Sequence, residues 1–157
     1  MKIIKGRTAV ITGAGSGFGL ELSRIAAREG MNLVMADVQQ DALDRAVEEI
    51  RGLGAQVLGF RLDVAKAAEV ESMGEAVRER FGAPHLVFNN AGVGAGGLIW
   101  EHTLKDWEWV VGVNLIGIFG GLVIGAGIGG VLAQHWGVTA PFWFAFVGSA
   151  IFCCVIW

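Results

Sequence analysis

Short apolar runs alternate with longer amphipathic segments along the first 114 residues of the chain. The apolar runs predict buried strands at residues 7–13, 32–37, 56–62 and 85–89. Apolar residues at helical spacing predict helices at 17–29, 40–53 and 66–81, and helical sequence resumes from 104 to 114. Alternating strands and helices indicate an α/β fold, with helices on both faces of a parallel sheet. The expected strand order is 3-2-1-4.

The second and third predicted helices are expected to pack one apolar face on the sheet and to expose their charged residues. In the helix at 40–53 the predicted inward residues are Ala42, Leu43, Ala46, Val47, Ile50 and Leu53. In the helix at 66–81 they are Ala67, Val70, Met73, Val77 and Phe81. Glycines follow the first three helices and fit helix ends, at Gly30, Gly54 and Gly82.

A glycine-rich turn, Thr-Gly-Ala-Gly-Ser-Gly-Phe-Gly, joins the first strand to the first helix at residues 12–19. Backbone N–H groups point outward at a helix N-terminus, and the helix dipole favours negative charge there. Gly13 permits the tight turn, Gly17 lets a pyrophosphate approach the backbone, and Gly19 lets the helix pack closely. A purely structural turn would have the same spacing. Asp37, at the end of the second strand, stands where a carboxylate accepts from a ribose 2′-OH, and therefore favours a dinucleotide site.

The spacing Thr-Gly-x-x-x-Gly-x-Gly resembles that of short-chain dehydrogenases/reductases, and the resemblance extends over residues 1–118. Further matches in the same order are Asp63-Val64 after the third strand, Asn89-Asn90-Ala91-Gly92 after the fourth, and Asn114 in Val113-Asn114-Leu115. The resemblance implies a Rossmann-like domain whose sheet is truncated after its fourth strand, which would leave that strand as an exposed edge.

The family resemblance also implies the cofactor and the residues that bind it. The implied residues are Gly13, Ser16, Gly17, Phe18, Gly19, Asp37, Asp63, Val64, Asn90, Ala91 and Gly92. NAD is expected rather than NADP, because a 2′-phosphate would meet the Asp37 carboxylate. Neither Ala14 nor Gly15 in the glycine turn offers a positive charge to offset that repulsion.

Most catalytic residues that the resemblance implies have no match in this sequence. Members of the family use a catalytic tetrad of an Asn, which Asn114 matches, and a Ser, a Tyr and a Lys that follow it in the sequence. This chain has no tyrosine, no lysine after Asn114, and Ser149 as its one serine after Asn114. His102 is expected to be a solvated loop side chain and His135 a loop residue, so neither replaces the acid–base group. Asn114 is then the single catalytic match. We expect no dehydrogenase activity from this chain alone, and weak NAD binding because the nicotinamide half of the site is missing.

Charge divides the chain into two regions. All 12 Lys and Arg and all 15 Asp and Glu residues lie at or before Glu108, and residues 109–157 contain none. The uncharged runs at 115–133 and 142–157 predict an apolar helical hairpin at 119–157, long enough in its first run to span a bilayer. Glycines at spacing four, from Gly117 to Gly129, fit close helix packing in a membrane.

The apolar segment at 120–157 resembles a helix pair of a major facilitator superfamily transporter, with a glycine-rich helix, a short loop ending in Pro141-Phe142 and a second apolar helix. Two helices cannot form a transport path, which needs helices from both repeats. A buried apolar helix pair without transporter ancestry is the alternative. The change in composition falls within residues 114–121, inside one expected helix, and suggests a fusion, a rearranged gene or an assembly artefact.

Composition narrows the range of functions. A net charge of −3 gives no reason to expect a nucleic-acid partner. The two cysteines, Cys153 and Cys154, are adjacent in an apolar run and form neither a disulfide framework nor a metal-ligand spacing. The N-terminus has no signal-peptide pattern, so residues 1–118 are expected to be cytoplasmic. Three hypotheses remain: an inactive NAD-binding oxidoreductase domain, a membrane-anchored binding protein, or a non-functional chimera. The sequence leaves the oligomeric state open.

Overall fold

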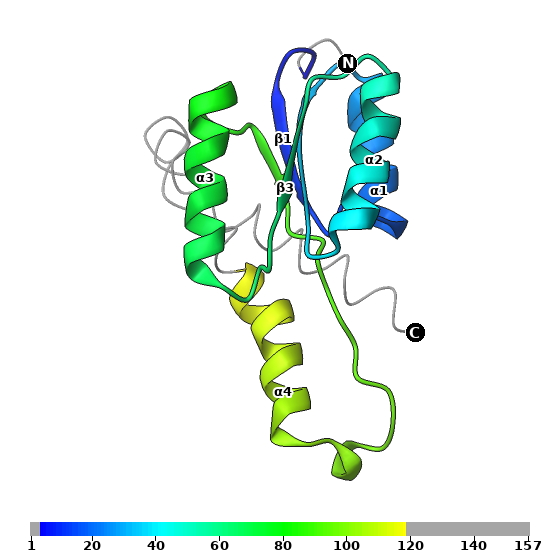
Figure 1. The fold of residues 1–157 in the computed structure, drawn as a ribbon, viewed down its shortest axis with the longest axis vertical. Helices are drawn as coiled ribbons and strands as arrows, with labels where there is room; N and C mark the ends of the chain where they lie inside the picture. The colour runs from blue at the N-terminus through cyan, green and yellow to red at the C-terminus, as the bar shows by residue number, and fades with distance from the viewer. Residues whose placement is uncertain (1–3, 119–157) are drawn as a thin grey trace.

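A four-stranded parallel sheet forms the centre of the part of the chain that the computed structural model describes, residues 4–118 (Figure 1). Its strands are β1 (Thr8–Thr12), β2 (Asn32–Asp37), β3 (Val57–Arg61) and β4 (Leu86–Phe88). The strand order is β3-β2-β1-β4, which confirms the predicted order and the Rossmann-like class. Because every neighbouring pair is parallel, the carboxyl ends of all four strands lie along the same edge.

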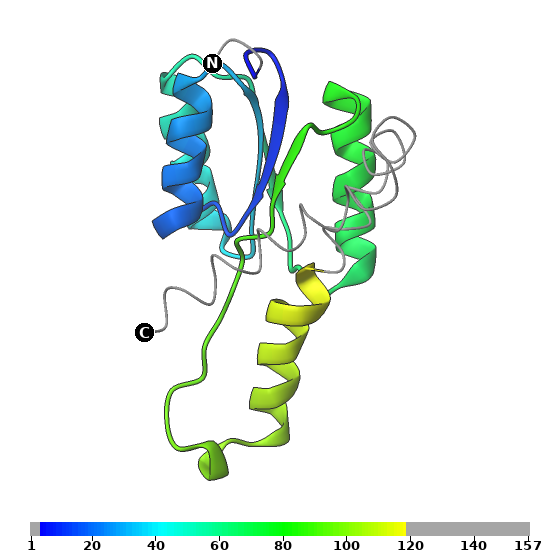
Figure 2. The same ribbon diagram turned by 180° about the vertical axis from the view of Figure 1, so that it is seen from behind.

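Helices cover both faces of this sheet. Helices α1 (Gly17–Arg28) and α2 (Gln40–Gly52) lie side by side on one face, and α3 (Ala67–Phe81) lies on the other (Figures 1 and 2). Alternate strand residues therefore face different helices. Ile11, Leu33 and Met35 pack with α1 and α2 in one buried cluster. Val10, Val34 and Ala36 pack with α3 in a second cluster.

The amphipathic pattern predicted most of the inward helix residues. Leu43, Ala46, Val47 and Ile50 of α2, and Val70, Met73 and Val77 of α3, are buried. Two predictions at helix ends are wrong. Leu53 follows the last residue of α2 and is exposed, and Ala67 begins α3 and is exposed. At a helix end the chain turns away from the sheet, so the helical spacing no longer determines which side is covered.

The segment after β4 extends beyond the carboxyl edge of the sheet and returns as a helix (Figures 1 and 2). It contains a 3₁₀ turn, η1 (Ile99–Glu101), and α4 (Leu104–Val111), which continues into a π-helical turn, η2 (Gly112–Ile116). This returning helix contacts the loop between β3 and α3 through glycines. A Cβ at Gly112 would lie 3.3 Å from Ala65 Cβ, and one at Gly117 would lie 2.7 Å from Val64 Cγ2.

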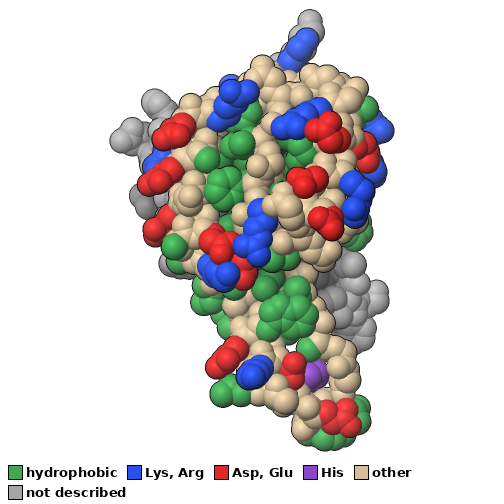
Figure 3. All heavy atoms as spheres, in the orientation of Figure 1, with side chains coloured by type: hydrophobic (Ala, Val, Ile, Leu, Met, Phe, Trp, Pro, Cys, Tyr) green, Lys and Arg blue, Asp and Glu red, His purple; other side chains and the backbone are tan. Residues whose placement is uncertain are grey.

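Charged side chains are spread over the sheet-and-helix body and also lie around α4, where a group of apolar side chains is exposed among them (Figure 3). Large apolar side chains of η1 and α4 are exposed, among them Trp100, Leu104, Trp107 and Trp109. Within residues 4–118, none of the helices is both long and apolar enough to cross a membrane. The predicted hairpin at 119–157, with His135, Ser149 and the two cysteines, lies outside the described residues.

Candidate functional site

The glycine turn lies at the carboxyl end of β1 and leads directly into α1. Gly13 and Gly17 have φ values of +63° and +53°, in the left-handed region that glycine adopts without a steric penalty. A Cβ at Gly13 would lie 2.9 Å from Ala91 Cα, and one at Gly19 would clash with the carbonyl oxygen of Gly13. A Cβ at Gly17 would meet nothing within 4 Å. The backbone at Gly17 therefore faces open space at the first turn of a helix.

Thr12 connects this turn to the segment after β4. Its hydroxyl donates to the Phe88 carbonyl at 3.3 Å and accepts from the backbone N–H groups of Asn90 and Ala91, both at 3.1 Å. The Asn90 side-chain amide donates back to the carbonyls of Thr12 at 3.0 Å and Gly13 at 3.3 Å. This network holds the ends of β1 and β4 together, and it fixes the shape of the glycine turn.

Asp37 joins the end of β2 to the same turn. Its Oδ2 accepts a hydrogen bond from the Gly15 N–H at 2.8 Å, and its Oδ1 accepts one from the Gln39 N–H at 2.9 Å. A Cβ at Gly15 would lie 2.9 Å from Asp37 Oδ2. Gly15 is therefore required for the close approach of a carboxylate to the turn.

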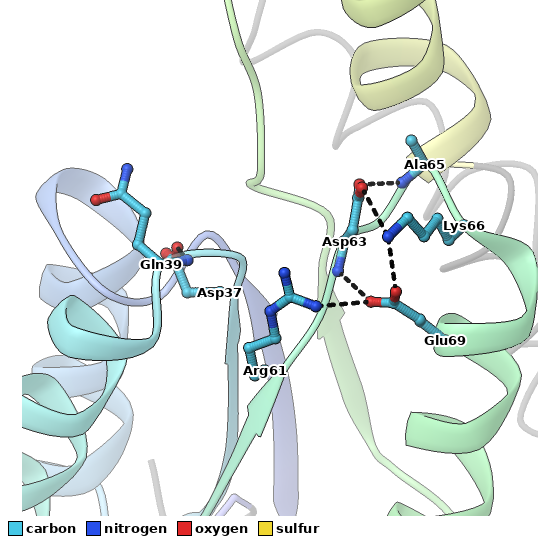
Figure 4. A network of polar contacts seen from close by, with 7 residues as sticks. All are labelled: Asp37, Gln39, Arg61, Asp63, Ala65, Lys66 and Glu69. Carbon is cyan, nitrogen blue, oxygen red and sulfur yellow. Dashed lines mark hydrogen bonds and ion pairs between the residues drawn. The ribbon is translucent and has the colours of Figure 1, made fainter.

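A charged network surrounds the end of β3 (Figure 4). The Glu69 carboxylate accepts from the Asp63 N–H at 2.8 Å, and it pairs with Lys66 Nζ at 3.0 Å and with Arg61 Nη1 at 3.8 Å. The hydrogen bond from the Asp63 backbone, followed by the one from Lys66, lowers the pKa of Glu69 below its ordinary value. Asp63 Oδ1 accepts from the Ala65 N–H at 3.1 Å. These contacts fix the β3–α3 loop beside the end of β2.

Asn114 holds the loop that follows Gly92. Its Oδ1 accepts from the Val93 N–H at 2.9 Å, and its Nδ2 donates to the Val93 carbonyl at 2.8 Å. Asn114 lies in the π-helical turn η2, and such turns are often found at functional sites. Both the oxygen and the nitrogen of the Asn114 amide are therefore hydrogen-bonded to the backbone of Val93.

The other predicted site residues lie along the same edge of the sheet. Ser16 immediately precedes α1, and the Phe18 side chain in its first turn is 74% exposed. Gly92 is exposed in the loop after β4, and Val64 packs beside the second core cluster. Residues that are distant in the sequence are thus gathered at the carboxyl ends of β1, β2, β3 and β4.

His102 differs from its expected solvated state. Its Nε2 atom is buried and has no hydrogen-bond partner among the described residues. The side chain faces a hollow of about 310 Å³ between the loop at 95–102 and α4, lined also by Asp106 and Trp107. The loop folds back over His102, and local sequence gives no sign of such a return.

Two further residues, Thr12 and Arg61, had no role predicted from the sequence. Each acquires its role only when a neighbouring strand lies beside it.

The arrangement of these residues defines a class of protein. A parallel α/β sheet that carries a glycine turn after its first strand and an acidic residue at the end of its second is a nucleotide-binding fold of the Rossmann class. A family model described as short chain dehydrogenase matches residues 7–135. The chain belongs to the short-chain dehydrogenase family. The match extends past residue 118, where the resemblance was expected to end, and none of the comparisons shows a transporter helix pair.

Individual relatives agree with this assignment. A CLA biosynthesis dehydrogenase/reductase from Lactiplantibacillus plantarum is 40% identical over 116 residues, which are 74% of this chain and 41% of that protein. The crystal structure of a short-chain dehydrogenase/reductase from Burkholderia phymatum in complex with NAD has a TM-score of 0.77 and 50% identity, covering 80% of this chain and 44% of that one. L-Sorbose reductase from Gluconobacter frateurii, complexed with NADPH and L-sorbose, has a TM-score of 0.75 and 31% identity, covering 85% and 51%. The chain therefore spans about half or less of the length of these relatives.

Proposed function

We propose that the described residues hold the adenosine and diphosphate part of a nicotinamide dinucleotide, as the cofactor-binding half of a short-chain dehydrogenase-type oxidoreductase. The observation that carries this proposal is the meeting of three strand ends at one turn. The Gly15 N–H is hydrogen-bonded to Asp37 at the end of β2, and the Thr12 hydroxyl is hydrogen-bonded to the N–H groups of Asn90 and Ala91 after β4. The geometry leaves the amino end of α1 facing open space at Gly17, where a diphosphate would fit.

The residues present fit such a cofactor. The first N–H groups of a helix have no partner within that helix, so those at the start of α1 are free to donate to an anion. The Asp37 carboxylate is fixed by two backbone N–H groups and keeps lone pairs for the hydroxyls of a ribose. A bound nicotinamide dinucleotide would supply the hydride-accepting or hydride-donating ring. The chain's own residues bind and orient its other end.

NAD is proposed as the preferred cofactor over NADP, because Asp37 places a negative charge where a 2′-phosphate would lie. We further propose that the 157-residue chain alone transfers no hydride. Its sequence has no tyrosine, and the Asn114 amide is occupied by the Val93 backbone. Proton transfer needs a titratable group within hydrogen-bond reach of the reacting oxygen; tyrosine is absent here, and the amide of Asn114 does not titrate.

Calorimetric titration of the 157-residue chain with NAD tests the binding proposal. Asp37→Asn should weaken NAD binding at least about tenfold, because the charge-assisted hydrogen bond to the ribose is lost and the new NH2 group faces one of the two N–H donors, of Gly15 or Gln39, that the carboxylate now accepts from. Glu29→Gln removes an exposed carboxylate next to the other end of α1 and should leave NAD affinity unchanged. Absence of binding at millimolar NAD would overturn the proposal. Formation of NADH from NAD and a secondary alcohol, above the buffer rate, would overturn the proposed inactivity.

A further inference from the structure

Arg61 occupies a position beside Asp37 that only the sheet reveals. The two residues end β3 and β2 and stand opposite each other in the parallel register. Neighbouring strands are about 4.8 Å apart, so an arginine side chain spans that distance with length to spare. In Figure 4 the guanidinium of Arg61 lies between Asp37 and Glu69, beyond the ends of the strands. A positive charge is therefore within reach of the ribose that Asp37 is proposed to bind.

The present partner of Arg61 holds it only weakly. The separation between Arg61 Nη1 and Glu69 Oε2 is 3.8 Å, with 49% of the arginine side chain exposed. Exposed ion pairs contribute about 0–1 kcal/mol. Glu69 keeps two shorter contacts, with the Asp63 N–H at 2.8 Å and with Lys66 Nζ at 3.0 Å. Because Glu69 stays well satisfied without Arg61, the guanidinium is free to move to a stronger acceptor.

We propose that Arg61 is the counter-charge for a 2′-phosphate at the ribose end of the site, so that this chain also binds NADP. The inference rests on the proposed dinucleotide function. A guanidinium presents several donors in one plane and pairs with two phosphate oxygens at once. Asp37 favours the ribose hydroxyl of NAD, and Arg61 offsets the repulsion between Asp37 and the phosphate of NADP. The two residues together set a modest preference for NAD instead of exclusion of NADP.

Titration of the full 157-residue chain with NAD and with NADP, at low and at moderate salt, tests this role. Arg61→Gln should weaken NADP binding about tenfold, the loss expected for one charge-assisted pair, and should change NAD affinity less than twofold. Arg61→Lys keeps the charge but loses the planar fork, so NADP binding should fall by an intermediate factor. Arg51→Gln is the matched control. Arg51 is exposed in the last turn of α2, at the end of that helix away from Asp37, and the ion pair that the structure gives it is with Glu48. Higher salt should weaken NADP binding more in the wild type than in Arg61→Gln.

The outcomes separate this inference from the proposed function. If the wild type binds neither dinucleotide, the proposed function is wrong, and the role of Arg61 falls with it. If the wild type binds NAD but not NADP, or if Arg61→Gln leaves NADP affinity unchanged, only the inference is overturned. An equal loss of both affinities in Arg61→Gln would show a structural role and would also overturn it. Should Arg61→Gln fail to fold, an unchanged ratio of NAD to NADP affinity in Arg61→Lys overturns the inference.

Discussion

The Asn114 side chain forms a reciprocal pair of hydrogen bonds with the backbone of Val93, 21 residues earlier in the chain. One side-chain amide thereby binds both the N–H and the carbonyl of a loop residue, the two groups that a neighbouring strand would bind in a sheet. We expect Asn114→Ala to release that loop and to lower the free energy of unfolding by about 1–3 kcal/mol. Hydrogen exchange should show a matching loss of protection at the Val93 amide.

Leu115→Ala serves as the control for this change. Leu115 is adjacent to Asn114 but is 64% exposed, so its truncation removes little buried surface. Its effect on unfolding should stay within about 0.5 kcal/mol, as is usual for surface positions. An unaltered rate of hydrogen exchange at the Val93 amide in Asn114→Ala would contradict the proposed role of Asn114 in holding this loop.

Glycine-to-alanine substitutions should have opposite effects at two helical positions. In α1, a Cβ at Gly19 would collide with the Gly13 carbonyl and lie 2.7 Å from Asn90 Nδ2, so Gly19→Ala should destabilise the fold by more than about 2 kcal/mol and weaken NAD binding. In α2, a Cβ at Gly52 meets nothing within 4 Å, and Gly52→Ala should be neutral or stabilise by up to about 1 kcal/mol. Urea unfolding of both variants checks the contrast, which similar midpoints would refute.

Thr12→Val should cost stability although it preserves side-chain shape. The substitution leaves the N–H groups of Asn90 and Ala91 without their acceptor, a loss of about 1–3 kcal/mol. Thr12→Ser keeps the hydroxyl and should retain most of the stability and of the NAD affinity. Loss of stability in Thr12→Ser but not in Thr12→Val would instead place the role of Thr12 in its methyl group.

His85 predicts a specific dependence of stability on pH. Its Nδ1 accepts a hydrogen bond from the Thr8 N–H at 3.2 Å, which only the neutral ring can do. Burial, and then the charge of Arg7, lowers the pKa of His85 below its ordinary value of 6.5. The unfolded chain therefore binds the proton more readily than the folded one, so this stabilisation is present above pH 6.5 and is lost as the pH falls through the folded-state pKa.

NMR titration should place the midpoint for His85 below 6.5. His85→Asn keeps an acceptor that does not titrate, and the decrease in stability between about pH 7 and pH 5 should be smaller in this variant. A midpoint above 6.5 would reverse the sign of the argument.

Most of the fold could be predicted because each element carries its own periodic pattern. The strand predicted at 32–37 agrees with the structure, and the other strands and the first three helices begin and end within one residue of the prediction. The glycine turn was predicted because strand, turn and helix are adjacent in sequence. Arg61 and His102 were not, because their surroundings come from elsewhere in the chain. Arg61 lies on β3, outside the glycine turn, and comes beside Asp37 only when the two strands pair.

The Thr12 hydroxyl joins segments 76 to 79 residues apart. The first strand, helix and second strand can assemble from nearby sequence, but the contacts that set the turn require closure of a long loop, which is entropically costly and slow. We therefore expect β4 to dock late in folding, so that ligand binding requires the completed fold. An intermediate in which β4 is still undocked would have the correct helices but no correctly shaped phosphate-binding turn. Nucleotide binding should therefore appear only with the final cooperative step of folding.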